Sequence, residues 1–271
     1  MVNSSPSAIQ LVPLGTNGFI PSLGRHTMSF LLLAGKEAIL MDAGTGVARL
    51  LEPQIIDLLG PFDCLNVILS HYHLDHVIGL SYLPGVWTRG VVRIYAPAHP
   101  LVQAEPDDAF GKLFSPPLFS LKLGDFPARI EVVRATSQNL TVGGLPLRLR
   151  AQQHPGGSVG IRVADVLAYV TDTVVDDATA EFVQGVRLLL HEVWLTDAEA
   201  QNDEVERSRH SYSSGVARTA KQAAVHELMP VHQHPRRTPA DIRRLADEIE
   251  ALAGVRVIIP QEGQVYPIEL S

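Results

Sequence analysis

Apolar and polar residues alternate over short runs through most of the chain, and Gly and Pro residues separate many of these runs. Alternation with a period of two between turn residues is typical of β-strands. Gly35 and Lys36 lie between two such runs and predict a hairpin. The pattern predicts strands at residues 8–14, 28–34, 37–41, 65–69, 91–95, 119–123, 129–133, 145–151, 159–163, 166–170, 186–193, 228–231, 255–259 and 265–268.

Other segments have apolar residues three or four positions apart, which is the spacing of one helical face. This spacing predicts helices at residues 45–59, 177–183, 213–225 and 239–252, and the segment after His76 is a further helix start. Helices interspersed with two runs of strands predict a layered α/β fold. No repeat, low-complexity tract or linker divides the sequence, so we expect residues 1–271 to form a single domain.

The composition limits the location and the partners of the protein. With 271 residues, 46% of them hydrophobic, the chain is large enough to bury a core. The net charge of −7 disfavours a protein that grips nucleic acid through a basic face. Cys64 is the single cysteine, so no internal disulfide can form. The start lacks the basic region of a signal peptide, and the apolar runs are too short to span a membrane. We therefore expect a cytoplasmic protein with no membrane partner.

The strongest chemical feature is residues 70–76, Ser-His-Tyr-His-Leu-Asp-His, directly after the predicted strand 65–69. Imidazole and carboxylate groups are ligands that suit zinc and similar divalent metals. His71 and His73 are two residues apart, so on an extended backbone they point the same way. Asp75 and His76 follow after the chain turns and can face a second metal. The alternative is a solvated histidine-rich loop, which the position at a strand end disfavours.

The motif H-x-H-x-D-H resembles that of the metallo-β-lactamase superfamily. The resemblance implies an αββα sandwich, in which two mixed β-sheets pack face to face with helices on their outer faces. Asp42-Ala43-Gly44 is similar to the first motif of the superfamily, and Asp42 would support the site from behind the ligands. His154, Asp172 and His232 each follow an apolar strand, in the order of the remaining ligands of the superfamily.

Carried over to this chain, the resemblance implies two divalent metal ions, expected to be Zn²⁺, with Mn²⁺ or iron as alternatives. The implied ligands are His71, His73 and His154 for the first ion, Asp75, His76 and His232 for the second, and Asp172 as the bridge. Two cations about 3.5–4 Å apart would lower the pKa of a shared water. Asp75 would also act in catalysis, by orienting this water or accepting its proton.

Two further segments resemble the ribonuclease Z and phosphodiesterase branch of the superfamily. Glu192 ends a strand in the sequence Leu-Leu-His-Glu, and His210-Ser211 precedes a helix. In that branch such a Glu orients a His, which donates a proton to the leaving oxygen. Carried over, Glu192 and His210 form a catalytic pair. The alternatives are a surface carboxylate at Glu192 and an ordinary helix N-cap at Ser211.

The sequence departs from the members that process transfer RNA. Those members carry a long Gly/Pro-rich arm between the third histidine and the bridging aspartate. Only 18 residues separate His154 from Asp172 here, and residues 157–170 predict a plain hairpin. Together with the acidic net charge, this favours a small phosphodiester or nucleotide, such as a cyclic nucleotide, over transfer RNA as the substrate.

Four functions stay open on the sequence alone. The favoured one is a phosphodiesterase, in which a hydroxide bridging both metals attacks phosphorus and His210 assists the leaving group. The others are a hydrolase of another ester (lactone, thioester or sulfate ester), a ribonuclease Z-type processing enzyme for the 3′ end of transfer RNA, and a metal-binding protein without catalysis. The resemblance also suggests a homodimer. Open, too, are the roles of His234, Arg236 and Arg237, and whether residues 87–137 supply a lid, with an irregular loop at 106–117.

Overall fold

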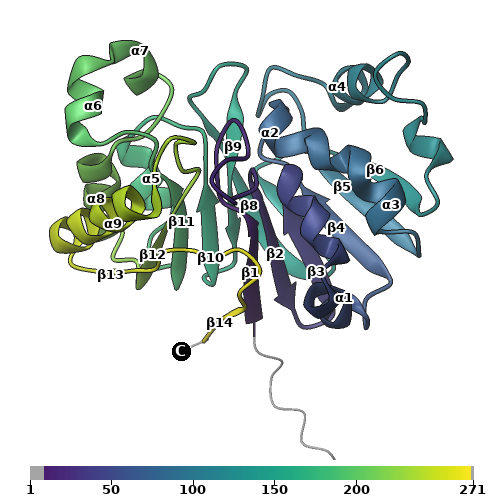
Figure 1. Cartoon of the computed structure of the whole chain (residues 1–271), viewed down its shortest axis with the longest axis horizontal. Coiled ribbons are helices and arrows are strands. Elements are labelled where there is room, and N and C mark those ends of the chain that lie inside the picture. Colours follow the sequence, from purple (N-terminus) through teal and green to yellow (C-terminus); the bar gives the residue numbers. More distant parts are fainter. Residues whose placement is uncertain (1–8, 270–271) are drawn as a thin grey trace, which may run out of the picture.

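The computed structural model describes residues 9–269 and contains two β-sheets that pack face to face (Figure 1). The first sheet has seven strands in the order β14-β1-β2-β3-β4-β5-β6. The strands in this sheet are β14 (Tyr266–Ile268), β1 (Ile9–Gly15), β2 (Ser29–Ala34), β3 (Glu37–Met41), β4 (Cys64–Ile68), β5 (Val91–Pro97) and β6 (Arg129–Ala135). Pairing is antiparallel from β14 to β3 and parallel from β3 to β6, so the sheet is mixed.

The second sheet is also mixed and has seven strands in the order β13-β12-β11-β10-β9-β8-β7. The strands in this sheet are β13 (Arg256–Val257), β12 (Glu227–Val231), β11 (Leu188–Glu192), β10 (Leu167–Val170), β9 (Ser158–Val163), β8 (Leu145–Gln152) and β7 (Asn139–Val142). Strands β7 to β10 pair antiparallel, and β10 to β13 pair parallel. The parallel strands of one sheet end at one edge, where their following segments can meet.

Helices cover the outer face of each sheet (Figure 1). The helices between strands of the first sheet are η1 (Thr45–Leu51), α1 (Pro53–Leu59), α2 (Leu74–Val77), η2 (Ile78–Tyr82), α3 (Leu83–Val86), α4 (Pro106–Leu113) and η3 (Leu123–Asp125). The helices between strands of the second sheet are α5 (Asp177–Phe182), α6 (Asp197–Asn202), α7 (Glu204–Arg207), α8 (Ser213–Gln222) and α9 (Pro239–Ala253). The layers run helix, sheet, sheet, helix, which confirms the predicted αββα sandwich.

Three large apolar clusters fill the three interfaces between these layers. The pleat of β2 explains how one strand serves two of them. Phe30 and Leu32 face the second sheet, whereas Leu31 and Leu33 face the helices of the first. All four side chains are buried, which is why this strand is apolar throughout rather than alternating.

Local sequence explains where the longest helix begins and ends. Thr238 caps the first turn of α9 and exchanges hydrogen bonds with Asp241, while Pro239 occupies the first helical position. Gly254 ends the helix with a φ of 69°, a left-handed conformation that glycine adopts without strain. Within the described residues, no helix combines the length and the apolar character needed to cross a bilayer.

Several predicted elements are wrong in detail. Residues 119–123 form a loop and the start of η3 instead of a strand, because their apolar side chains pack beside Phe114 without pairing to a sheet. The predicted helix 45–59 is split at Glu52, since Pro53 can start a helix but not continue one. The expected irregular loop at 106–117 contains α4. Residue 8, predicted to begin the first strand, lies outside the described residues.

The short elements β7, α6 and α7 were not predicted either. The signal for α6 was present in the sequence, because Thr196 and Glu199 have the spacing of a capping box and form one. The predicted hairpin between His154 and Asp172 is confirmed, since β9 and β10 pair antiparallel across a short turn. No long arm interrupts the chain at this point.

Candidate metal centre

All seven predicted ligands lie at one edge of the sandwich, where strands of both sheets end. From the first sheet, His71 and His73 follow β4, and the short helix α2 carries Asp75 and His76. The second sheet contributes the side chains that follow β8, β10 and β12, which are His154, Asp172 and His232. His71 and His76 are almost completely buried, which argues against a solvated loop.

Three imidazoles form the first group of ligand atoms. Nε2 of His71 lies 3.0 Å from Nδ1 of His73, which lies 3.2 Å from Nε2 of His154. Oδ1 of Asp172 lies 3.4 Å from the same His154 nitrogen. These four residues place one ligand atom each within 4.8 Å of all the others. The three histidines expected at the first ion therefore converge with one oxygen of the expected bridge.

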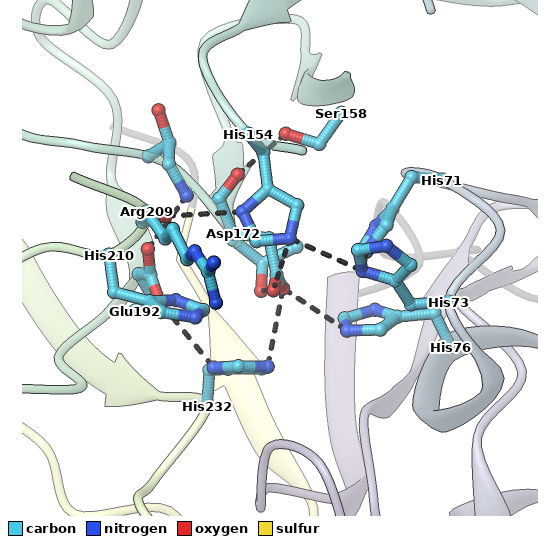
Figure 2. Close-up of polar contacts among 12 residues, drawn as sticks. His71, His73, His76, His154, Ser158, Asp172, Glu192, Arg209, His210 and His232 are labelled. Carbon is cyan, nitrogen blue, oxygen red and sulfur yellow. Dashed lines mark hydrogen bonds and ion pairs between the residues drawn. The ribbon is translucent and has the colours of Figure 1, made fainter. Parts of the chain in front are cut away.

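Asp75, His76 and His232 form the second group. Nε2 of His76 lies 3.2 Å from Oδ2 of Asp75 and 3.1 Å from Oδ2 of Asp172. Nε2 of His232 lies 3.4 Å and 3.3 Å from the same two oxygens. Asp172 thus turns one oxygen to each group, and the imidazoles of both groups surround it (Figure 2).

Both groups fit divalent cations. Donor atoms on a tetrahedral zinc ion lie about 3.3 Å apart, since each is about 2.0–2.2 Å from the metal. The donor spacings of 3.0 Å to 3.4 Å agree with this value. Nε2 of His76 and Nε2 of His232 are buried without a well-directed hydrogen bond. Such buried nitrogens are costly unless an ion or another partner satisfies them.

Asp42 lies behind the ligands and is completely buried. It accepts hydrogen bonds from the backbone N–H and the hydroxyl of Ser70, at 2.6 Å and 2.7 Å, and from the Tyr169 hydroxyl at 2.7 Å. Nδ1 of His76 lies 2.7 Å from the same carboxylate. As an acceptor at 2.7 Å, Asp42 keeps a proton of His76 on Nδ1, and Nε2 faces Asp75 and Asp172.

The backbone at three strand ends is unusual. Asp42, Asp172 and His232 have φ angles of 56°, 49° and 53°. These angles lie in the left-handed region, which residues other than glycine adopt uncommonly. Each residue directly follows β3, β10 or β12 or lies one residue further on. Strained conformations of this kind concentrate at functional sites, where the surrounding structure holds them in place.

Charge differs between the two groups of ligands. In the first, burial lowers the pKa of His71 well below its ordinary value, and neighbouring imidazoles such as His76 lower it further. Burial likewise lowers the pKa values of His73 and His154. These three imidazoles are therefore neutral near pH 7, and their nitrogen lone pairs are available to a metal.

In the second group, nearby carboxylates have the larger effect on the pKa values of the histidines. Burial opposes a charge on His232, but Asp172 and Asp75 outweigh it and raise the pKa of His232 to about 10. The pKa of His76 is raised well above its ordinary value against the same opposition. Burial favours protonation of Asp75 and Asp172, yet His76 and His232 hold both of their pKa values well below the usual range. The carboxylates thus attract positive charge, which cations would supply in place of protons.

Glu192 and His210 form the expected pair beside the ligands. Oε2 of Glu192 lies 2.9 Å from Nδ1 of His210, and Oε1 accepts backbone N–H groups of Thr173 and Ser211 at 2.7 Å and 3.2 Å. Glu192 is completely buried, so it is not a surface carboxylate. Ser211 is not the helix N-cap either, since α8 begins after Tyr212 and the Ser211 hydroxyl donates to the Thr173 carbonyl.

The two side chains stabilise each other's charge. Burial would raise the pKa of Glu192, but His210 lowers it to about 2. Burial would lower the pKa of His210, but Glu192 raises it above the ordinary value. The His210 ring stacks between Trp194, with centroids 4.9 Å apart, and His232, with centroids 5.6 Å apart. Glu192 thus fixes both the orientation and the protonation of His210.

A cavity of about 470 Å³ opens over the ligand groups. It is lined by Phe19, His73, Asp75, His154, Pro155, Asp172, Trp194, Glu206, Arg209, His210 and His232. Arg209 is the only Lys or Arg among these residues. Nη1 of Arg209 is 3.9 Å from Oε1 of Glu206, and its guanidinium group extends toward the ligands (Figure 2). The cavity therefore carries one permanent positive charge at its wall.

The three residues of unassigned role lie around a neighbouring cavity of about 640 Å³, on the far side of Trp194. Arg237 is nearly buried and donates to the Trp194 carbonyl at 2.7 Å and to Glu199 at 2.5 Å, so it supports the wall. The His234 ring packs on Trp194 with centroids 4.5 Å apart. Arg236 lines the neighbouring cavity and not the one over the ligands.

Residues 87–137 form more than a lid. They supply strands β5 and β6 of the first sheet, with α4 between them. Helix α4 and Leu118 line an apolar cavity of about 520 Å³, together with Tyr72 and Leu74, the sequence neighbours of His73. The segment is therefore part of the sandwich, and only its middle portion borders a cavity near the ligands.

A family model described as a beta-lactamase superfamily domain matches residues 37–233. The chain belongs to this family. The matched range begins at β3 and ends one residue after His232, so it contains every predicted ligand of this beta-lactamase superfamily domain and both members of the Glu192–His210 pair.

Known proteins resemble this beta-lactamase superfamily domain over most of its length. Ribonuclease Z of Nocardia farcinica is 28% identical over 287 aligned positions, which cover 88% of this chain and 92% of the relative. An uncharacterised protein of Mycobacterium tuberculosis is 28% identical over 246 positions, which cover 87% and 84%. The metallo-beta-lactamase fold protein YhfI of Bacillus subtilis matches with a TM-score of 0.75 and 22% identity, over 96% of this chain and 99% of that one.

Sequence reasoning missed five residues that line the cavity of this beta-lactamase superfamily domain: Phe19, Pro155, Trp194, Glu206 and Arg209. Trp194 and Arg209 flank predicted residues in sequence, Trp194 two positions after Glu192 and Arg209 directly before His210. That proximity was the available signal. Phe19 comes from a loop between β1 and β2, outside the matched range, and only the folded chain brings it to the ligands.

Proposed function

We propose that this protein is a phosphodiesterase that uses two divalent metal ions, with zinc as the expected metal. The proposed ligands are His71, His73 and His154 for one ion, Asp75, His76 and His232 for the other, and Asp172 as the bridge. A ribonuclease Z relative and the family as a whole support hydrolysis. The observation that carries the phosphodiester assignment is the Glu192–His210 pair, because its proton can serve a leaving oxygen.

When bound, the ions would polarise the phosphoryl group and lower the pKa of an attacking water. Side chains of the protein would orient the water, transfer protons and neutralise charge. Asp75 is ionised and lies among the second group of ligands, so it can orient the water or accept its proton. His210 carries a proton and has a ring nitrogen within 4.8 Å of ligand atoms of Asp172 and His232, so it can protonate the leaving oxygen. Arg209 can neutralise the charge of the diester.

Small phosphodiesters fit this site better than transfer RNA. The hairpin of β9 and β10 leaves no long arm at the expected position. The alignment with ribonuclease Z of Nocardia farcinica runs over 287 positions, more than the 271 residues of this chain, so that relative carries insertions. The uncharacterised relative from Mycobacterium tuberculosis aligns over only 246 positions. We therefore propose a cyclic nucleotide or a short nucleotide as the substrate.

The test is a substrate panel on protein of measured metal content. Bis(4-nitrophenyl) phosphate, cyclic AMP, a lactone, a thioester, an aryl sulfate and a precursor transfer RNA are assayed in parallel. We expect turnover of the phosphodiesters above all others. Preferred turnover of a lactone, thioester or sulfate ester would refute the proposal. Efficient cleavage of precursor transfer RNA without turnover of the small phosphodiesters would refute it as well. Two metal equivalents without any turnover would indicate a metal-binding protein without catalysis.

The single domain, the cytoplasmic location and the homodimer stay predictions. The cluster between the two sheets supports the first, because residues from both sheets share one core. Sedimentation of the purified protein and fractionation of the cells that produce it test the other two.

A further inference from the structure

Phe19 lies in the wall of the cavity over the ligands, yet the residue is 70% exposed. Single apolar residues on a surface are common. The backbone of Phe19 is not, because its φ of 63° lies in the left-handed region, where bulky side chains are rare. Burial of the ring within the chain does not compensate for this strain, so the conformation calls for another explanation.

Contacts to both sheets hold the backbone around Phe19. The N–H of Phe19 donates to Oδ2 of Asp75 at 2.7 Å. The preceding N–H, that of Gly18, donates to the carbonyl of Gln233 at 3.0 Å. A Cβ on Gly18 would lie 2.3 Å from Cε1 of His232, so the loop lies directly against that ring. The backbone at Phe19 is therefore held against Asp75 and His232, which are two of the proposed ligands, and against Gln233.

The cavity holds a permanent cation as well as this exposed aromatic ring. Arg209 and Phe19 both line it, together with the Glu192-bound His210. Its volume of about 470 Å³ is typical of sites for small organic ligands. A phosphodiester at the ligand groups leaves one esterified group to lie along the wall. A planar, rigid aromatic side chain at that wall suits a planar group, because stacking tolerates any base with a π-face.

We propose that Phe19 is a specificity-determining residue that stacks on the base of a nucleoside phosphodiester. This inference rests on the proposed phosphodiesterase function and adds the side chain that selects nucleosides over simple alkyl diesters. Phe19 takes no part in bond cleavage. It contributes to binding of the nucleoside, and this contribution is absent for a diester without a base.

The test uses two diesters with the same leaving group and the metal-loaded protein. One is thymidine 5′-(4-nitrophenyl phosphate), and the other is methyl 4-nitrophenyl phosphate. We expect Phe19→Ala to lower the ratio of their kcat/KM values about tenfold, mainly through KM of the thymidine substrate. The methyl substrate is expected to keep its rate. Phe19→Trp should preserve the ratio, and Phe19→Leu, which keeps apolar bulk without a plane, should lower it.

Leu23 supplies a matched control. It lies in the same loop, has a φ of 51° and is 58% exposed, but it does not line the cavity. Leu23→Ala should leave both rates unchanged. If Phe19→Ala and Phe19→Leu turn over both diesters with the kcat/KM ratio of the wild type, the inference about Phe19 is overturned and the proposed function stands. No turnover of either diester by the metal-loaded wild type overturns the proposed function and this inference with it.

Discussion

Gly18 lies so close to His232 that a Cβ at residue 18 would come within 2.3 Å of the imidazole Cε1. Gly18→Ala should therefore displace the ring and weaken metal binding at the second group, by about 10- to 100-fold as for other residues that support ligands. Metal analysis after dialysis, with turnover measured on the same samples, checks this. Gly85→Ala, with no atom within 4 Å of the new methyl and no left-handed φ, is a control for the added methyl and should retain metal. Unchanged metal affinity in Gly18→Ala would contradict the expected contact.

His73 and His210 should respond differently to removal. His73→Ala removes the nitrogen that lies 3.0 Å and 3.2 Å from those of His71 and His154, so metal content and turnover should both be lost. His210→Ala should keep the metal and slow substrates with poor leaving groups by about 10²- to 10⁴-fold, with a smaller effect on 4-nitrophenyl esters. Metal analysis and rates over a series of leaving groups separate the two outcomes. Equal slowing across the series would remove the proton-donor role of His210.

Arg209 should recognise the negative charge of the substrate. Arg209→Met keeps the length of the side chain without the charge, and we expect KM for bis(4-nitrophenyl) phosphate to rise about tenfold. Diethyl 4-nitrophenyl phosphate has the same leaving group and no charge, so its kinetics should not change. Arg209→Lys should recover part of the loss, because a Lys supplies charge without the planar fork. Equal effects on the charged and the neutral ester would refute charge recognition.

Asp176 links stability to pH away from the ligands. It accepts the Thr179 N–H at 2.7 Å as the cap of α5 and pairs with Arg150. Burial would raise the pKa of Asp176, but Arg150 and the Thr179 N–H lower it below its ordinary value. A lowered pKa in the folded state stabilises the protein above the unfolded value of about 3.9, and this contribution is lost as pH falls through the folded pKa.

Two substitutions at Asp176 separate the charge from the cap. Asp176→Asn keeps a capping oxygen, so its deficit in unfolding free energy at pH 7 should shrink as pH falls below about 4. Asp176→Ala also loses the cap and should cost about 1 kcal/mol more at pH 7. Urea unfolding at pH 7 and at lower pH, at equal metal content, measures both. A deficit of Asp176→Asn that does not depend on pH would contradict the ion pair.

Removal of metal should lower thermal stability as well as abolish turnover. An ion that binds only the folded chain adds about 2.7 kcal/mol at a free concentration 100 times its dissociation constant. Chelation should therefore lower Tm, and addition of zinc should restore both Tm and activity. Calorimetry on the chelated and the reloaded protein checks this. An unchanged Tm would indicate that these side chains do not hold an ion in the folded state.

The proposed ligands could be predicted from the sequence because they lie shortly after strands whose apolar pattern is clear. His154 and Asp172 come two residues after strands with a continuous or alternating apolar pattern, His232 directly follows β12, and residues 70–76 contain the other four. The order of these residues along the chain then sufficed for the resemblance. The sandwich followed from the same strands, since two runs of strands separated by helices have few other arrangements.

The wall of the cavity could not be found in this way. Phe19 and Arg209 lie in loops whose course depends on contacts between distant residues, such as Phe19 with Asp75 and the Arg209 carbonyl with His154. No periodicity marks such positions. The wrong strand at residues 119–123 has the opposite cause, because Phe119 follows an apolar pattern that reflects packing on Phe114 without backbone pairing.

The ligands are divided between the two sheets, with His71, His73, Asp75 and His76 on one and His154, Asp172 and His232 on the other. Neither half of the chain alone can supply a complete coordination sphere at the bridge. If these residues bind metal as proposed, we expect ion capture to follow docking of the two sheets, and a partly assembled chain to hold metal only weakly. Metal binding would then be a late step that stabilises the assembled sandwich, and bound metal would distinguish fully folded molecules from partly folded ones.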